Sequence, residues 1–319
     1  GLGGLWQDAL ALLDEALVQG LDDGSVYGAA AFALGVAGAS PVLPRVASAR
    51  RKEASVLEYV HERANRGNLD EAMLAIERFA QERQWLKVAG GTKRKLLEGV
   101  LCPGDRVAEL GTYVGYSAMV MTRRLRCLGG GGRVTSCELD PESAAVAREV
   151  LAWAGADGTT VVRVGCAADW LVTGRVGSTD VLILDHRGTM YHEDLRLAEP
   201  LFARPSAARV LADNVLSPGA PLFLESVALG AYDVTIHEVC EFMQPELDDW
   251  VVVCGPRSGA ASALGAAGAL ARPTRPDLVR WSLAIDVVSW RSMKDPVDWV
   301  AFQRRLKPAL CAWRLDRGV

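Results

Sequence analysis

The stretch from Val107 to Ser117 constrains the fold more than any other part of this sequence. It reads VAELGTYVGYS, a short apolar segment that contains Glu109 and is followed by Gly111 and Gly115. An apolar run that ends in spaced glycines is typical of a strand that turns into a helix, and the glycines leave backbone room for a ligand at the turn. The stretch therefore predicts a βα unit that binds a ligand beyond the end of its strand.

The spacing at this turn separates two classes of nucleotide ligand. It follows the pattern E-x-G-x-x-x-G, whereas a turn that cradles a dinucleotide pyrophosphate follows G-x-G-x-x-G. The carboxylate of Glu109 would repel a phosphate group, but it would attract a cationic amine. The turn therefore favours S-adenosylmethionine over a dinucleotide. The alternative interpretation is a plain strand-turn-helix junction with packing glycines.

Apolar segments and helical segments alternate through the middle of the chain. Two helices are expected first, at about Val56 to Ala64 and Asp70 to Gln84. Strands are expected at Arg106 to Leu110, Arg133 to Glu138, Thr160 to Val164, Val181 to Asp185 and Arg209 to Ala212. This alternation predicts an α/β fold with a doubly wound, mostly parallel sheet, which binds ligands beyond the carboxyl ends of its strands.

Acidic side chains stand where several of these strands end. Glu138 ends the second strand shortly before Pro141, where an adenosine-binding fold places a carboxylate that accepts hydrogen bonds from ribose hydroxyls. Asp185 ends the most hydrophobic strand, and Asp213 and Asn214 follow the next one. Two carboxylates and an amide are hard oxygen ligands that suit Mg²⁺. The alternative role for these acids is to cap the helices that follow them.

Composition excludes some classes of function. The chain has 319 residues, of which 50% are hydrophobic, and a net charge of -4, which provides no basic field for nucleic acid. No apolar run reaches the length of a membrane span. The seven cysteines form no C-x-x-C pair, so reduced thiols and a cytoplasmic protein are expected, although the chain starts at Gly1 and not at methionine. The oligomeric state stays open, and a monomer is compatible with the sequence.

The two ends of the chain differ from its middle. The segment around Trp6 to Ala30 has helical periodicity and resembles one degenerate pentatricopeptide repeat, a module that binds RNA only in stacked copies. RNA binding is therefore a minor hypothesis. The expected organisation is a helical hairpin over residues 1–37, a linker over 38–54, the α/β domain over 55–256, a flexible linker over 257–272 and a C-terminal extension of unknown role over 273–319.

The ordered set of motifs resembles catechol O-methyltransferase, a class I S-adenosylmethionine-dependent methyltransferase. The resemblance runs from about Ser55 to Pro256 and rests on these segments: Glu109 to Ser117, Glu138-Leu139, Leu184-Asp185-His186, Ala212-Asp213-Asn214-Val215 and Pro218-Gly219-Ala220-Pro221. It implies a Rossmann-like seven-stranded sheet and Mg²⁺-dependent transfer of a methyl group from S-adenosylmethionine to a hydroxyl of a small catechol-like diol, with no membrane partner.

The resemblance also implies roles for individual residues. The cofactor would contact Ala89, Glu109, Gly111, Tyr113, Ser117, Glu138, Leu139, Gly165, Cys166, Ala167, Ala168 and Asp185. Mg²⁺ would bind Asp185, Asp213 and Asn214, while Trp85 and Pro218 would wall the acceptor ring. Glu241 and Asn214 would both contact the acceptor hydroxyls, and Glu241 would accept a hydrogen bond from the second one.

One departure from the family concerns the general base. The family's catalytic lysine falls on Gly188, and the tryptophan that covers the cofactor falls on Arg187. A guanidinium keeps its proton, so Arg187 would act only electrostatically. His186 and His192 are the candidate proton acceptors. The loss of the lysine also supports a second hypothesis, a methyltransferase-like binding or scaffold protein with impaired catalysis. An NAD-dependent oxidoreductase is a further alternative.

Overall fold

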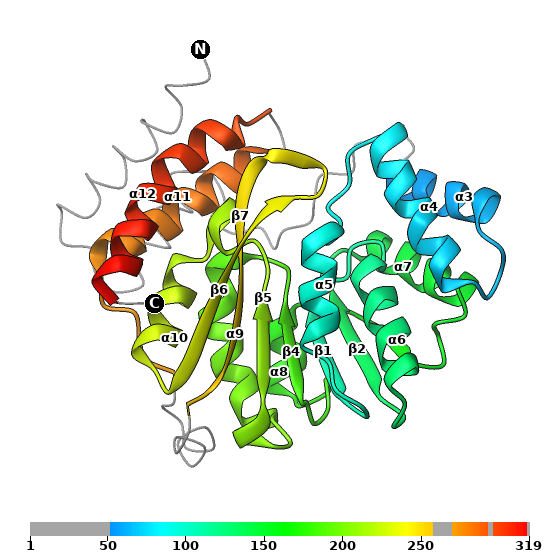
Figure 1. Ribbon diagram of the computed structural model, residues 1–319, viewed down its shortest axis with the longest axis horizontal. Helices are drawn as coiled ribbons and strands as arrows, with labels where there is room; N and C mark the ends of the chain where they lie inside the picture. The colour runs from blue at the N-terminus through cyan, green and yellow to red at the C-terminus, as the bar shows by residue number, and fades with distance from the viewer. Residues whose placement is uncertain (1–51, 258–269, 293–295, 318–319) are drawn as a thin grey trace. The chain divides into compact units, whose positions relative to one another are not determined.

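A seven-stranded sheet forms the centre of the computed structural model, which describes residues 52–257, 270–292 and 296–317 (Figure 1). The strand order is β3-β2-β1-β4-β5-β7-β6. The strands are β1 (Arg106–Leu110), β2 (Arg133–Glu138), β3 (Thr160–Val164), β4 (Val181–Leu184), β5 (Arg209–Ala212), β6 (Tyr232–Glu241) and β7 (Gln244–Pro256). The sheet confirms the predicted Rossmann-like α/β class.

The first five strands are parallel, and the last two form an antiparallel hairpin at one edge. All four residues of β4 are buried, as expected for a strand that is covered on both faces. Strand β7 runs opposite to β5, with Ala212 opposite Val252. Residues of β7 that precede Val252 therefore extend past the carboxyl end of β5, and β6 ends at Glu241 near the same edge.

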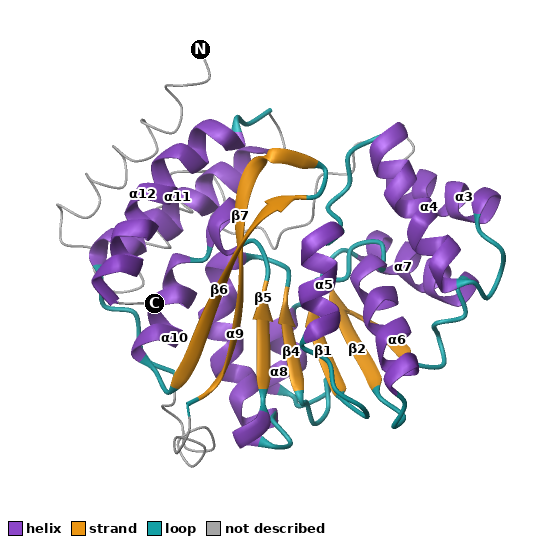
Figure 2. Ribbon diagram, viewed as in Figure 1, coloured by secondary structure: helices purple, strands orange, loops and turns teal. Residues whose placement is uncertain are grey.

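Helices cover both faces of the sheet (Figure 2). On one side lie α3 (Lys52–Arg63), α4 (Leu69–Glu82), α5 (Gly91–Gly99), α6 (Tyr116–Leu128) and α7 (Pro141–Trp153), and on the other lie α8 (Ala167–Val172), α9 (Tyr191–Ala198) and α10 (Pro221–Leu229). The sequence marks several helix starts. Asn68 caps α4 by accepting the amide of Glu71 at 3.1 Å, and Asp140 caps α7, which begins with a proline.

The C-terminal part of the chain contributes α11 (Pro276–Ser292) and α12 (Trp299–Arg317). Helix α12 belongs to the same compact unit as the sheet and packs on β7 and on the helical turn η4 (Val215–Gly219). The side chain of Gln303 donates a hydrogen bond to the carbonyl of Asp248. The described part of Thr274–Asp298, which contains α11, belongs to a second unit.

Most of the elements expected in the middle of the chain are present. The five expected strands appear with boundaries that differ by at most one residue, because β4 ends at Leu184. Helix α3 begins at Lys52, so the end of the expected linker over 38–54 is helical. The expected hairpin over residues 1–37 and most of the linker over 257–272 lie outside the described residues. No helix in the described ranges has the length and apolarity of a membrane span.

Candidate functional site

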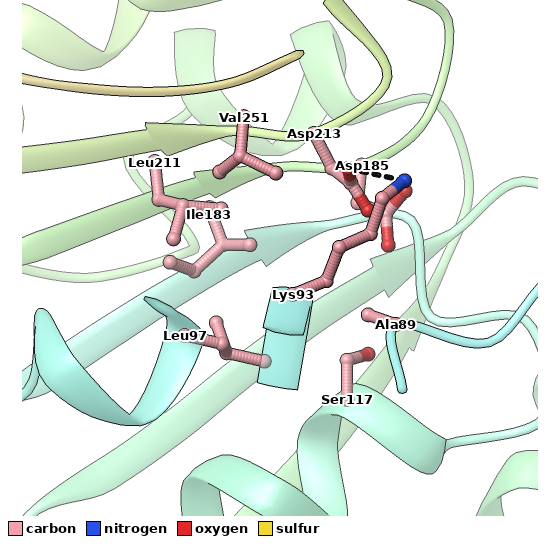
Figure 3. Close-up of a pocket in the computed structure, with 9 residues that line it drawn as sticks. All are labelled: Ala89, Lys93, Leu97, Ser117, Ile183, Asp185, Leu211, Asp213 and Val251. Atoms are coloured by element: carbon pink, nitrogen blue, oxygen red, sulfur yellow. Dashed lines mark ion pairs between the residues drawn. The ribbon is translucent and has the colours of Figure 1, made fainter. Parts of the chain in front are cut away.

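A buried lysine sits among three carboxylates at the carboxyl edge of the sheet. The ammonium nitrogen of Lys93 lies 2.8 Å from Asp213, 2.5 Å from Glu241 and 2.7 Å from Asp249, in each case measured to a carboxylate oxygen. Only 4% of Lys93 is exposed. Figure 3 shows the lysine side chain reaching from α5 toward Asp213 and Asp185. Four different elements thus supply one polar cluster.

Lys93 remains charged in this cluster. Burial lowers the pKa of Lys93, but attraction by Asp213, Asp249 and Glu241 outweighs that effect, so the pKa lies well above its ordinary value. Asp249 is fully buried, and its pKa is raised because burial outweighs the opposing effect of Lys93. An ammonium ion therefore supplies positive charge to this edge of the sheet.

Asn214 and the turn η4 hold the carboxylates in place. The side-chain amide of Asn214 donates to Glu241 at 2.8 Å and to Asp249 at 3.2 Å. The other oxygen of Asp249 accepts the backbone amides of Leu216 at 3.2 Å and Ser217 at 3.0 Å. Asp249 thus joins the hairpin to the turn that follows β5.

Asp185 lies in the same region, but it is held less firmly. Burial and the nearby charge of Asp213 raise the pKa of Asp185 well above its ordinary value, although Lys93 opposes the shift. No hydrogen bond or ion pair to its carboxylate is found among the described residues. A carboxylate without such a partner, close to Asp213 and Asn214, fits an oxygen-binding cation such as Mg²⁺ by its chemistry. No set of three or more His, Cys, Asp and Glu side chains in the described ranges is spaced to hold a metal ion.

The turn after β1 carries a second buried carboxylate. Glu109 is fully buried; one of its oxygens accepts a hydrogen bond from Ser136, and the other oxygen, Oε1, has no partner. Burial raises the pKa of Glu109 to about 7, although the nearby hydroxyl groups of Ser117 and Ser136 oppose the shift. An unpartnered buried oxygen fits the cationic amine of S-adenosylmethionine, which would restore the missing interaction.

Glu138 lies against this turn. Its carboxylate accepts the backbone amides of Thr112 at 3.2 Å, Tyr113 at 2.8 Å and Asp140 at 2.9 Å. The amide of Gly165 donates to the carbonyl of Glu138 at 2.8 Å, so the turn after β3 lies beside it. Two other residues expected at the adenosine are exposed, namely Leu139 and Cys166. Ala167 and Ala168 begin helix α8 in this turn.

Gly111 is required at its position in the first turn. Its φ is 101°, and a Cβ atom there would lie 2.1 Å from the carbonyl oxygen of Asp185. Any side chain would therefore push apart the turn after β1 and the end of β4. This close backbone approach brings the expected cofactor turn next to the expected metal ligand.

One small cavity is lined by residues from both expected sites. Its walls include Ala89 and Ser117, expected at the cofactor, and Asp185 and Asp213, expected at the metal (Figure 3). Lys93 also lines this cavity. The volume is about 10 Å³, room for about one water molecule. The structure thus brings the two predicted groups of residues together around one space.

The candidate bases after β4 have different environments. The Nε2 atom of His186 lies 2.7 Å from Asp194, whose side chain is 4% exposed. His192 is buried, and burial lowers its pKa to about 4. Arg187 donates to the hydroxyl of Thr189 at 3.1 Å. At Gly188, where the resemblance implies the family lysine would fall, an added Cβ atom would lie 2.4 Å from the carbonyl oxygen of Gly219.

The expected ring walls lie on different segments. Trp85 follows α4 and is 42% exposed, and the Lys52 ammonium lies 5.3 Å from its ring centre. Pro218 belongs to η4, the turn that also binds Asp249. Their roles as walls stay predictions.

Sequence reasoning missed Lys93 and Asp249. Lys93 lies in the first turn of α5, where the helix dipole disfavours a cation, and this position could have suggested an acidic partner. Asp249 and Val251 are two residues apart on β7, so they share a face of the strand, and Val251 lines the cavity. The sequence of the hairpin alone did not indicate that this face of β7 meets the site.

Comparisons with known proteins agree with this geometry. A family model described as a methyltransferase domain matches residues 108–214. Catechol O-methyltransferase B of Danio rerio is 34% identical over 178 residues, which cover 54% of this chain and 66% of that protein. Catechol O-methyltransferase of Mus musculus is 31% identical over 182 residues, which cover 55% of this chain and 68% of that protein. The chain thus spans about two thirds of the length of these relatives.

A solved structure shows the same fold. The O-methyltransferase TomG of Streptomyces achromogenes, crystallised with S-adenosylmethionine, is similar with a TM-score of 0.50 and 24% sequence identity. The similarity covers 64% of this chain and 96% of that protein.

Proposed function

The chain belongs to the class I S-adenosylmethionine-dependent O-methyltransferases, the family that includes catechol O-methyltransferase, and on that premise we propose that it methylates a hydroxyl of a catechol or similar vicinal diol. The observation that supports this proposal is the shared cavity. Ala89 and Ser117 line it from the cofactor side, and Asp185 and Asp213 line it from the acceptor side. The proposed donor side and acceptor side therefore adjoin each other at this cavity.

In this proposal the cofactor binds along the carboxyl ends of β1 to β3. Glu109 would pair with the amine of the methionine moiety, because its Oε1 atom is buried without a partner. Glu138 would bind the ribose hydroxyls from its position beside Tyr113, and Leu139 with the turn from Gly165 to Ala168 would contact the adenine.

The acceptor binds at the other side of the cavity. Asp185, Asp213 and Asn214 would hold Mg²⁺, which would orient the two hydroxyls and stabilise the phenolate when bound. Lys93 and the side-chain amide of Asn214 both donate to the Oε1 atom of Glu241, and no other contact of this carboxylate is found among the described residues. Its Oε2 atom would therefore accept the hydrogen bond of the second hydroxyl. Trp85 and Pro218 would position the ring, and fixed orientation would supply much of the rate acceleration.

His186 is the better candidate for the proton acceptor. Its contact with the Asp194 carboxylate orients the ring with Nε2 as the donor, which leaves Nδ1 as the accepting nitrogen. His192 has a pKa of about 4 and is a weak base at neutral pH. Arg187 would contribute only positive charge, because a guanidinium does not release its proton.

The test is transfer of a labelled methyl group from S-adenosylmethionine to a simple catechol, with Mg²⁺ and with EDTA. We expect product with Mg²⁺ and loss of product with EDTA. Turnover that EDTA does not change would contradict the role of the metal, though not methyl transfer itself. No turnover under either condition, with the cofactor still bound, would favour the catalytically impaired scaffold protein that the glycine at position 188 also suggests.

A further inference from the structure

Lys93 is the feature of the site that the proposed reaction does not yet use. Its ammonium contacts Asp213, which the proposal assigns to the metal, and Glu241, which it assigns to the acceptor. Its third contact, Asp249, belongs to neither group. The lysine side chain is 3% exposed, so these carboxylates take the place of water around the ammonium.

Acidic side chains outnumber the single basic side chain in this cluster. Four carboxylates gather here, from Asp185, Asp213, Glu241 and Asp249, and Lys93 contacts three of them. Asp185 has no ion pair among the described residues. The acidic side chains therefore attract a further cation to this site. The ammonium of Lys93, which contacts Asp213, repels that cation.

We propose that Lys93 is an internal counter-cation that shares Asp213 with the metal and thereby keeps the metal affinity low. This inference rests on the metal site of the proposed function. Lys93 contacts Oδ1 of Asp213, which leaves Oδ2 of that carboxylate for the metal. The contacts with Glu241 and Asp249 anchor the ammonium beside the metal, because both carboxylates would still hold it after the metal binds.

A second consequence concerns the protein without metal. A cluster of buried carboxylates that depended on a metal for its positive charge would repel itself once the metal left. Here Lys93 supplies positive charge permanently, and Asn214 adds two hydrogen bonds. The site therefore keeps its shape without the metal, and the metal exchanges readily.

The inference is tested by the affinity for Mn²⁺, an ion that prefers the same oxygen ligands as Mg²⁺. The free ion is measured by electron paramagnetic resonance during titration of the full chain, without cofactor or acceptor. The variants are Lys93→Met, which removes the charge, and Lys93→Gln, which removes the charge but keeps hydrogen-bond donors. Lys95→Met is the matched control, because Lys95 is an exposed lysine on the same helix.

We expect both Lys93 variants to bind Mn²⁺ roughly ten- to hundredfold more tightly than the wild type, because a unit charge next to a ligand carboxylate has been removed. Lys95→Met should match the wild type. Equal or weaker binding by the Lys93 variants, with native circular dichroism, would overturn the role of Lys93 and leave the metal site intact. No Mn²⁺ binding by any of these proteins would overturn both the inference and the metal site.

Discussion

A Cβ atom at Gly188 would lie 2.4 Å from the carbonyl oxygen of Gly219. The resemblance to the family places its catalytic lysine at Gly188, and Gly219 belongs to the turn η4 that follows β5. The two backbones are too close for any side chain at position 188. A lysine at position 188 would therefore require the backbone of η4 to move.

Substitution of Gly188 should destabilise the fold. We expect Gly188→Ala to lower the free energy of unfolding by about 1–3 kcal/mol, because the methyl group would displace the backbone of η4. Gly158→Ala is the control, since a Cβ atom there meets nothing within 4 Å. Urea unfolding of both variants measures the difference. Equal free energies of unfolding would show that the backbone of η4 moves aside without destabilising the fold. Gly188→Lys could then be used to test whether a lysine base restores activity.

Glu109 should make cofactor binding depend on pH. Burial raises its pKa to about 7, and only the ionised carboxylate pairs with an amine cation, so binding below pH 7 must release a proton. We expect the affinity for S-adenosylmethionine to rise roughly eightfold from pH 6 to pH 7.5, in proportion to the ionised fraction of Glu109. Glu109→Gln should bind more weakly and lose this dependence, whereas Glu142→Gln, at the exposed start of α7, should keep it. Calorimetric titration with S-adenosylmethionine at the two pH values measures these affinities. If the affinity of Glu109→Gln changed with pH as that of the wild type does, Glu109 would not be the residue that binds the amine.

Glu241 should act on the acceptor and not on the cofactor. We expect Glu241→Gln to lower kcat/KM for a catechol by about 10- to 100-fold, because a charged hydrogen bond to the second hydroxyl is lost. Cofactor affinity should stay unchanged. Glu246→Gln is the matched control on the same hairpin, since Glu246 is exposed. Steady-state kinetics and a cofactor titration separate the two effects, and a comparable loss in the control variant would contradict the assignment.

The opposite edge of the sheet holds a buried ion pair that should matter for stability alone. Arg209 donates to both oxygens of Asp105, at 2.9 Å and 2.7 Å, and Asp105 is fully buried. We expect Arg209→Met to lower the free energy of unfolding by about 3–5 kcal/mol, because it leaves a poorly compensated buried charge. Arg257→Met breaks an exposed pair with Asp233 and should cost about 0–1 kcal/mol. Similar unfolding midpoints in urea for the two variants would argue against this difference.

The parallel part of the sheet could be predicted because its signals are local. The run from Val181 to Leu184 is apolar throughout, and the glycines after Glu109 mark a turn. Asp185 and Asp213 follow adjacent parallel strands, so their proximity was expected from the rule that such strands end at one edge. These features depend on short stretches of sequence.

The lysine cluster could not be predicted in the same way, because its members are joined only by tertiary structure. Lys93 and Glu241 are 148 residues apart in the sequence. Asp249 reaches the site because β7 runs antiparallel to β5, and no pattern within the hairpin fixes that direction or its register. The side chain of Lys93 also points inward, against the usual exposure of lysine.

The antiparallel hairpin has a consequence for how this site can diverge. Glu109, Gly111 and Glu138 belong to the parallel strands and their turns, whereas Glu241 and Asp249 are carried by β6 and β7 at the sheet edge. In the proposed function, substitutions at Glu241 in the hairpin would alter one acceptor contact while Glu109, Gly111 and Glu138 on the methyl-donor side keep their geometry. The hairpin and the parallel strands thus carry separate parts of the proposed site, which can change independently.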